Sequence, residues 1–205
     1  KKLFALFAFA VGITHAAKAD TYDPVASAQA VITAGNARFT VLTPEMIRIQ
    51  YSHDGRFEDR ATFGVVNRRL PVPAFKQTQK DGILEIKTSA LTLRYKVGGV
   101  IDASQRSPEV LNIKMKLNGR DILWYPGKDD AMNLKGTTRT LDGSMGDNKR
   151  EQLENGLLSR AGWAVIDESP LTKRGDGSTS FVLDNKQRGG GIDWWSEPVD
   201  KQATD

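Results

Sequence analysis

Apolar and polar residues alternate along the chain from residue 28 onward, and no sustained helical stripe is present. Alternation of this kind is typical of strands with one buried face. Short strands between turn signals predict an all-β fold, an antiparallel β-sandwich, and the missing strand–helix rhythm argues against a Rossmann-type fold or a barrel. The strands are expected at 30–33, 37–42, 46–51, 62–66, 75–79, 83–88, 91–97, 111–117, 122–125, 162–169 and 180–184.

Three dipeptides mark tight turns between consecutive strands. Gly35-Asn36, Asp81-Gly82 and Asn118-Gly119 each separate two alternating runs, and such pairs favour two-residue β-hairpin loops. The stretch from Pro126 to Arg160 differs, because it is rich in Gly, Asp, Asn, Thr and Lys and poor in β-branched apolar residues. A loop of this length within a compact domain is typically functional or disordered.

The N-terminal segment has the three-part pattern of a secretory signal. A Lys1-Lys2 pair precedes an uncharged apolar run from Leu3 to Ile13, and Ala17-Lys18-Ala19 fits the small-x-small cleavage rule. The apolar run is shorter than the roughly 20 residues that a membrane-spanning helix needs. Residues 1–19 are therefore expected to be a signal peptide, which predicts an exported protein, periplasmic or extracellular, with no membrane anchor after cleavage.

Removing this segment changes the charge of the chain. The formal net charge is +4, and residues 1–19 contain Lys1, Lys2 and Lys18 but no acidic residue, so the remaining protein carries +1. No basic run remains that would favour nucleic acid over a mixed, solvated surface, and no nucleic-acid partner is expected.

Cysteine and histidine content limits the possible chemistry. The sequence has no cysteine, which removes disulfides, thiolate catalysis and Cys-based metal sites. His15 lies in the predicted signal peptide, so His53 is the single histidine of the remaining sequence, within the turn-like sequence SHDG. Neither a multi-histidine metal site nor a cofactor is therefore expected, and a solvated turn is favoured for His53.

Three stretches of the chain are specific in combination. They are Ala37 to Ser52, two strands around a Thr-Pro break, then Asn133 to Gly143, and then Leu153 to Ser169, with its Gly-Leu-Leu-Ser-Arg core. Their order and spacing resemble the N-terminal domain of glycoside hydrolase family 31, the α-glucosidase and α-xylosidase family, over nearly all of the chain after the signal. Two positions depart from the family pattern, since relatives often have Gly-Gly at Lys135-Gly136 and Pro at Asn155.

The resemblance implies a β-sandwich similar to that of galactose mutarotase, paired with a catalytic (β/α)8 barrel in a retaining enzyme that acts on α-linked oligosaccharides. The catalytic aspartates of the family lie on the barrel, which typically takes about 250 residues, and their motif is absent from this sequence. We expect a β-sandwich domain at 20–192, a linker at 193–205 towards a missing barrel, and no catalytic residue. A secreted stand-alone β-sandwich that binds carbohydrate or protein without catalysis is the alternative.

The resemblance also implies a substrate-binding loop. In the family a sandwich loop reaches over the mouth of the barrel, and Thr138, Arg139 and Asp142 are the candidates here. Arg139 and Asp142 have side chains that can hydrogen-bond sugar hydroxyls. The alternative is that these two residues pair with each other and fix the shape of the loop.

Four further residues are candidates for the interface between sandwich and barrel. Arg160 and Trp163 either join the sandwich to the barrel or pack in the core. Trp194 and Trp195 are neighbours in an extended tail, so their side chains would point in opposite directions, and packing between domains is favoured over a platform for sugar. The loop carboxylates, expected to be solvated or local hydrogen-bond acceptors rather than a catalytic dyad, are Asp142, Asp147, Asp167, Glu168 and Asp193.

Overall fold

The computed structural model describes residues 22–62, 65–135, 155–168 and 179–184. Within these ranges the chain is all-β, with two five-stranded antiparallel sheets. The helices of the described ranges are two 3-10 turns, η1 (Ala28–Ala30) and η2 (Ala103–Gln105), and neither is long and apolar enough to cross a membrane. This architecture confirms the all-β prediction and the antiparallel pairing.

Several predicted features lie outside the described residues. They are the signal peptide at 1–19, the substrate-loop candidates Thr138, Arg139 and Asp142, and the tail at 193–205 with Trp194 and Trp195.

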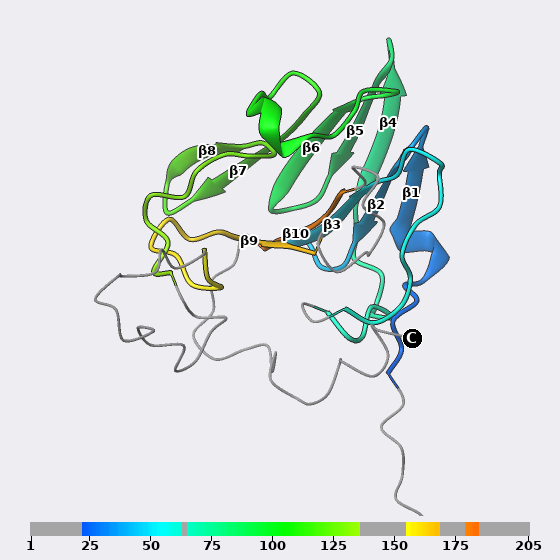
Figure 1. The fold of residues 1–205 in the computed structure, drawn as a ribbon, viewed down its shortest axis with the longest axis horizontal. Coiled ribbons are helices and arrows are strands. Elements are labelled where there is room, and N and C mark those ends of the chain that lie inside the picture. Colours follow the sequence, from blue (N-terminus) through cyan, green and yellow to red (C-terminus); the bar gives the residue numbers. More distant parts are fainter. Residues whose placement is uncertain (1–21, 63–64, 136–154, 169–178, 185–205) are drawn as a thin grey trace, which may run out of the picture.

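The first sheet combines strands from both ends of the described chain (Figure 1). Its central strand β3 pairs on one side with β2, which precedes it in the sequence. On the other side β3 pairs with β10, which lies far along the chain. The turn at Gly35-Asn36 joins β1 to β2 as predicted, and Gly35 has a φ of 58°. In spatial order the strands are β1 (Val31–Ala34), β2 (Ala37–Val41), β3 (Met46–Tyr51), β10 (Thr179–Asp184) and β9 (Ala164–Asp167).

The second sheet consists of strands that follow one another along the chain (Figure 1). Two of its hairpins have residues with positive φ at both turn positions, 51° and 75° at Asp81-Gly82 and 51° and 76° at Asn118-Gly119. Positive φ at both positions defines the type I′ turn, whose twist matches that of paired strands. In spatial order the strands are β4 (Lys76–Lys80), β5 (Ile83–Lys87), β6 (Leu91–Lys96), β7 (Leu111–Leu117) and β8 (Arg120–Trp124).

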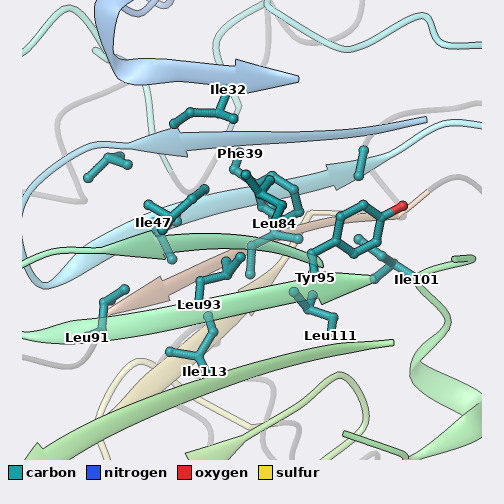
Figure 2. Packing of buried hydrophobic residues seen from close by; sticks show 14 of the residues in the cluster. Ile32, Phe39, Ile47, Leu84, Leu91, Leu93, Tyr95, Ile101, Leu111 and Ile113 are labelled. Atoms are coloured by element: carbon teal, nitrogen blue, oxygen red, sulfur yellow. The ribbon is translucent and has the colours of Figure 1, made fainter. Parts of the chain in front are cut away.

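Apolar side chains from both sheets form one core. Figure 2 shows Phe39 and Ile47 of the first sheet facing Leu93 and Tyr95 of the second. The rings of Phe39 and Tyr95 lie 5.3 Å apart between centroids in a tilted arrangement, a geometry that aromatic pairs favour. The hydroxyl of Tyr95 donates to the carbonyl of Gly99 at 2.7 Å, which satisfies its polar end within the core.

The outer faces of the two sheets differ. All six residues of β3 are buried, including Arg48 and Gln50, which alternation places on the face opposite Ile47, Ile49 and Tyr51. They are covered because the chain between Ser52 and Leu70 crosses this face, where Val65 and Leu70 pack on Met46 and Leu42 in a second small apolar cluster. On the second sheet the outward residues of β5, β6 and β7 alternate with buried ones and are half-buried or exposed.

One predicted strand is absent. Thr62, Val65 and Val66 of the expected strand at 62–66 lie outside any strand. The amide of Thr62 instead bonds to the carbonyl of Val65 at 3.3 Å, which makes a local turn. Val65 packs against Leu42 and Met46 on the outer face of the first sheet, so its partial burial needs no strand partner.

Candidate functional site

Two loop segments meet beside the sheets and form what we call the loop junction, residues 130–135 and 155–162. Asn133 and Ser159 form an isolated antiparallel bridge. Next to it, the amide of Leu134 donates to the carbonyl of Leu158 at 2.9 Å, and the amide of Arg160 donates to the carbonyl of Met132 at 3.1 Å. These bonds hold two segments, more than twenty positions apart in sequence, as a miniature ladder.

The side chain of Asn133 fastens the loop junction from within. Its Nδ2 donates to the carbonyl of Gly156 at 3.0 Å, and its Oδ1 accepts from the amides of Gly156 and Lys135, each at 2.8 Å. Asp130 is buried and accepts from the amide of Met132 at 3.1 Å. Backbone groups of a loop are costly to leave unpaired, and these two side chains satisfy them.

The loop junction exposes large apolar side chains. Met132, Leu134 and Leu158 are 45%, 50% and 47% exposed, although backbone hydrogen bonds hold their segments in place. A single exposed leucine is ordinary, but apolar side chains gathered on one ordered ladder mark a surface that can bind a partner. We call Met132, Leu134 and Leu158 the apolar patch.

Arg160 and Trp163, the two described residues of the predicted domain interface, differ in exposure. Arg160 follows the bridge residue Ser159 and is exposed, so its side chain is available at the surface of the loop junction. Trp163 is only 5% exposed and belongs to the core between the sheets. The sequence left two roles open for Trp163, contact with a barrel or packing in the core, and the structure shows packing in the core.

A buried ion pair lies on the outer face of the first sheet. Nε of Arg48 donates to Oε2 of Glu168 at 3.1 Å, and the two side chains are 1% and 0% exposed. Arg48 also donates from Nη1 to the carbonyl of Glu58 at 2.8 Å. Oε1 of Glu168 accepts from the hydroxyl of Thr62. The pair thus joins β3, the end of β9 and the crossing segment.

Arg68 adds a second buried cation, so that Arg48, Thr62, Arg68 and Glu168 form an ionic cluster. Nη2 of Arg68 donates to Oγ1 of Thr62 at 2.9 Å, and Nη1 donates to the carbonyl of Arg60 at 2.9 Å. Burial lowers the pKa of Arg68 to about 10. It also lowers the pKa of Arg48, while the charge of Glu168 opposes this shift.

Both guanidinium groups remain charged at neutral pH, and two cations face one carboxylate in the ionic cluster. Among the described residues, Nη2 of Arg48 and Nε of Arg68 have no hydrogen-bond acceptor. The cluster is closed to solvent by its burial, so its chemistry is to position the segments that contribute to it. A charge that is buried and paired in this way is costly to disrupt.

The prediction that Glu168 is solvated or a local acceptor is wrong, because its partners are distant in sequence and its side chain is fully buried. The sequence contains one signal that points to it. Arg48 lies in β3 among Met46, Ile47 and Ile49, and a cation that is covered by another segment of the chain needs an acid as its partner. Which acid pairs with it depends on how β9 is placed, and that is a tertiary property.

The remaining candidates for chemistry are dispersed. Asp167 is exposed on β9, and Asp142, Asp147 and Asp193 lie outside the described residues. His53 is exposed in a turn, as predicted, with its ring 5.0 Å from that of Tyr51. Across the described ranges, no group of histidine and carboxylate side chains is arranged to hold a metal ion.

No protein-family model matches the chain, and no curated protein is significantly similar to it. The resemblance to glycoside hydrolase family 31 therefore rests on the residues of the chain itself.

Proposed function

We propose that the chain is the non-catalytic N-terminal β-sandwich domain, of the galactose mutarotase-like type, of an exported family 31 glycoside hydrolase. The parent enzyme is a retaining α-glucosidase or α-xylosidase. In it, this domain packs on the catalytic barrel and helps to shape the pocket for an α-linked oligosaccharide.

The observation that carries the proposal is the contact between the three stretches of the resemblance. Arg48 of the first stretch pairs with Glu168 of the third, and Asn133 of the second bonds to Gly156 of the third. These stretches are far apart in sequence. Contacts between the three stretches are expected if the stretches together build one shared structure.

The two departures from the family pattern also support the proposal. Lys135 has a φ of 60°, a backbone conformation in which glycine is favoured, and relatives often have glycine at this position. Asn155 replaces the proline of many relatives, and its Oδ1 accepts a hydrogen bond from Nζ of Lys135 at 2.7 Å. The two unusual residues therefore contact each other and compensate in part for the strain at Lys135.

In this proposal the loop junction is the docking element. The apolar patch would be covered by the barrel, with the exposed Arg160 beside it. The substrate-loop candidates Thr138, Arg139 and Asp142 lie three to seven positions after Lys135 in the sequence. A ladder that anchors the start of this loop would also fix how the loop approaches the mouth of the barrel.

The coding sequence that follows Asp205 tests the proposal. We expect it to encode a barrel with two catalytic aspartates. The extended protein should hydrolyse aryl α-glucosides or α-xylosides with retention of configuration, whereas the 205-residue chain should not. A stop codon directly after Asp205, or turnover by the short chain that is lost in an Asp142→Asn or Asp193→Asn variant, would overturn the proposal.

We also propose that the protein is exported with residues 1–19 removed, on the strength of its signal-like N-terminal pattern. N-terminal sequencing of protein recovered from the periplasm or medium should begin at Asp20 or within a few residues of it. An intact Lys1 on soluble exported protein would contradict the proposal.

A stand-alone secreted binding module remains the second candidate, and the closed core favours it. Apolar residues of both sheets, such as Phe39, Ile49, Leu93 and Ile113, are fully buried without any partner. A core of this kind is sufficient for an independently folding domain. A stable, monodisperse monomer, together with a stop codon after Asp205, would favour this candidate over the enzyme domain.

A further inference from the structure

The outer face of the second sheet has an unusual arrangement of cations. The strand register aligns one row of outward side chains across all five strands. Lys76 lies opposite Lys87, Lys87 opposite Thr92, Thr92 opposite Lys114, and Lys114 opposite Leu123. Like charges directly opposite each other destabilise a sheet, so the Lys76–Lys87 pairing has a cost that folding alone does not explain.

Further basic residues extend this row into a basic face. Arg94, Lys96 and Lys116 are exposed at positions that alternate with the buried residues of β6 and β7, and Lys80 is exposed on β4, where every residue is exposed. In the described part of the chain, the sole ion pair on this face joins Arg94 to Glu85 at 3.4 Å. The whole chain has a net charge of only +4, so positive charge is segregated onto this face.

The basic face is also hollowed. Two shallow hollows of about 430 and 440 Å³ lie on it, and both are lined by Lys114 and Leu123. The first extends to Lys87 and Thr92, and the second reaches Asn112. Oδ1 of Asn112 is buried and has no hydrogen-bond donor among the described residues. The hollows share two residues, so we treat them as one groove across the strands, in which Lys87, Lys96, Lys114 and Lys116 outnumber the two lining carboxylates, Asp121 and Glu109.

We propose that this groove binds a linear acidic polysaccharide, a chain of sugars that carry carboxylates. The carboxylates complement the lysines, while the apolar faces of the sugar rings fit against Leu123 and sugar hydroxyl groups hydrogen-bond to Thr92. A flat lipid surface fits a hollowed face poorly. Among the described residues that line the hollows, the aromatic one is Tyr95, which is buried, so no exposed aromatic anchor of the kind that centres a protein interface is present there.

This inference concerns a surface distinct from the loop junction, so it holds or fails independently of the proposed enzyme. The probe is polygalacturonate, with its fully methyl-esterified form as a ligand of the same backbone and no charge. Binding to the purified chain is measured by calorimetry at low and at physiological ionic strength. We expect binding to polygalacturonate that weakens as salt rises, and binding at least about tenfold weaker to the ester.

Variants that reverse the charge of the basic face provide the second test of this inference. A Lys87→Glu/Lys114→Glu variant should bind polygalacturonate at least about tenfold more weakly, and Lys87→Gln/Lys114→Gln should give a smaller loss in the same direction. The control is Arg56→Glu/Arg69→Glu, which changes the net charge equally at exposed residues of other segments and should alter binding less than about twofold. Circular dichroism and thermal melting verify that each variant is folded.

Several outcomes would overturn the inference. An equal loss of affinity in the control variant and in the face variants would show that binding depends on the net charge of the protein and not on this face. Equal or tighter binding to poly-L-glutamate would identify an acidic protein as the partner, and equal or tighter binding to phosphatidylglycerol vesicles would identify a membrane. Equal binding of the methyl ester would show that the carboxylates are not recognised.

Discussion

At the scale of single residues, the ion pair of Arg48 and Glu168 connects parts of the chain that the sheets alone would leave separate. Glu168 follows β9, Arg48 lies in β3, and Thr62 belongs to the crossing segment. Burial of two charges is costly and is offset only when each finds good partners. Here the benefit is specificity, because a misplaced crossing segment would leave one charge unpaired.

This arrangement predicts a strongly non-additive mutational response. Arg48→Met or Glu168→Leu alone should lower the free energy of unfolding by about 3–5 kcal/mol, since each leaves the other charge buried without its partner. The double variant should lose much less than the sum of the two single losses. Urea denaturation of the four proteins measures the coupling, and strict additivity would contradict the interpretation of a coupled pair.

Asp54 offers a prediction about pH. Its carboxylate accepts from the hydroxyl of Ser52 at 2.6 Å and from the amide and Nε of Arg56 at 2.9 and 2.6 Å. These bonds, that from Ser52 foremost, hold its pKa well below the ordinary value of 3.8. Because the pKa of Asp54 is lower in the folded than in the unfolded state, its ionised form stabilises the protein at any pH above the ordinary pKa. This stabilisation is lost as the pH falls below the ordinary pKa towards the lowered one.

The Asp54→Asn variant cannot ionise, so its free energy of unfolding should depend less on pH in this range. Denaturant titrations between pH about 6 and about 2 should give a shallower acid slope than the wild type. Asp121→Asn, at an exposed position on β8, is the matched control and should retain the slope of the wild type. Parallel acid slopes for wild type and Asp54→Asn would contradict the role given to Ser52 and Arg56.

At the scale of elements, the loop after β8 depends on one glycine. Gly127 has a φ of 78°, and a Cβ placed on it would lie 1.9 Å from the carbonyl oxygen of Ala103 in η2. The backbone of this loop and that of η2 can therefore approach closely only because the side chain is missing. The approach positions the start of the segment that leads to Asp130 and the loop junction.

Gly127→Ala should therefore lower the free energy of unfolding by about 2–4 kcal/mol, because both the backbone angle and the contact with Ala103 must change. Gly119→Ala is a matched control, since its φ is 76° and nothing lies within 4 Å of the added Cβ. It should cost only the strain of the backbone angle, about 1–2 kcal/mol. Chemical denaturation compares them, and equal losses would show that the contact with η2 is unimportant.

The elements with local signals were predictable from the sequence. Type I′ turns at Asp81-Gly82 and Asn118-Gly119, and the alternating runs around them, require only neighbours along the chain, and the structure confirms them. The strand expected at 62–66 is wrong for Thr62, Val65 and Val66, which lie outside any strand, and Val65 instead packs against Leu42 and Met46 in a tertiary contact. Alternation also failed to predict the burial of Arg48, since a pattern cannot tell which face another segment covers.

At the scale of the whole molecule, the loop junction stands apart from the closed core. The core is complete in both sheets, whereas the apolar patch of Met132, Leu134 and Leu158 lies on an ordered ladder outside it. The sequence could not identify Met132 and Leu134 as part of this patch, because their exposure depends on the pairing of two distant loops. The substrate-loop and tail residues remain predictions.

The apolar patch predicts weak self-association of the isolated chain, because apolar surface without a partner drives association. The variant Leu134→Ser/Leu158→Ser should shift sedimentation towards the monomer and reduce binding of a hydrophobic dye. Val72→Ser/Val100→Ser is the control, since these valines are both 41% exposed elsewhere and should contribute little. A wild-type chain that is monomeric at all accessible concentrations, or equal effects of both variants, would contradict the prediction.

The edge strand β4 also determines how copies of this protein avoid one another. Edge strands offer unpaired backbone groups that can recruit a strand from a second molecule and start a fibril. Every residue of β4 is exposed, and its sequence Lys-Gln-Thr-Gln-Lys has a cation at each end and no apolar residue. Two such strands brought edge to edge would set lysine against lysine, so continued growth of this sheet from one molecule to the next is opposed by charge.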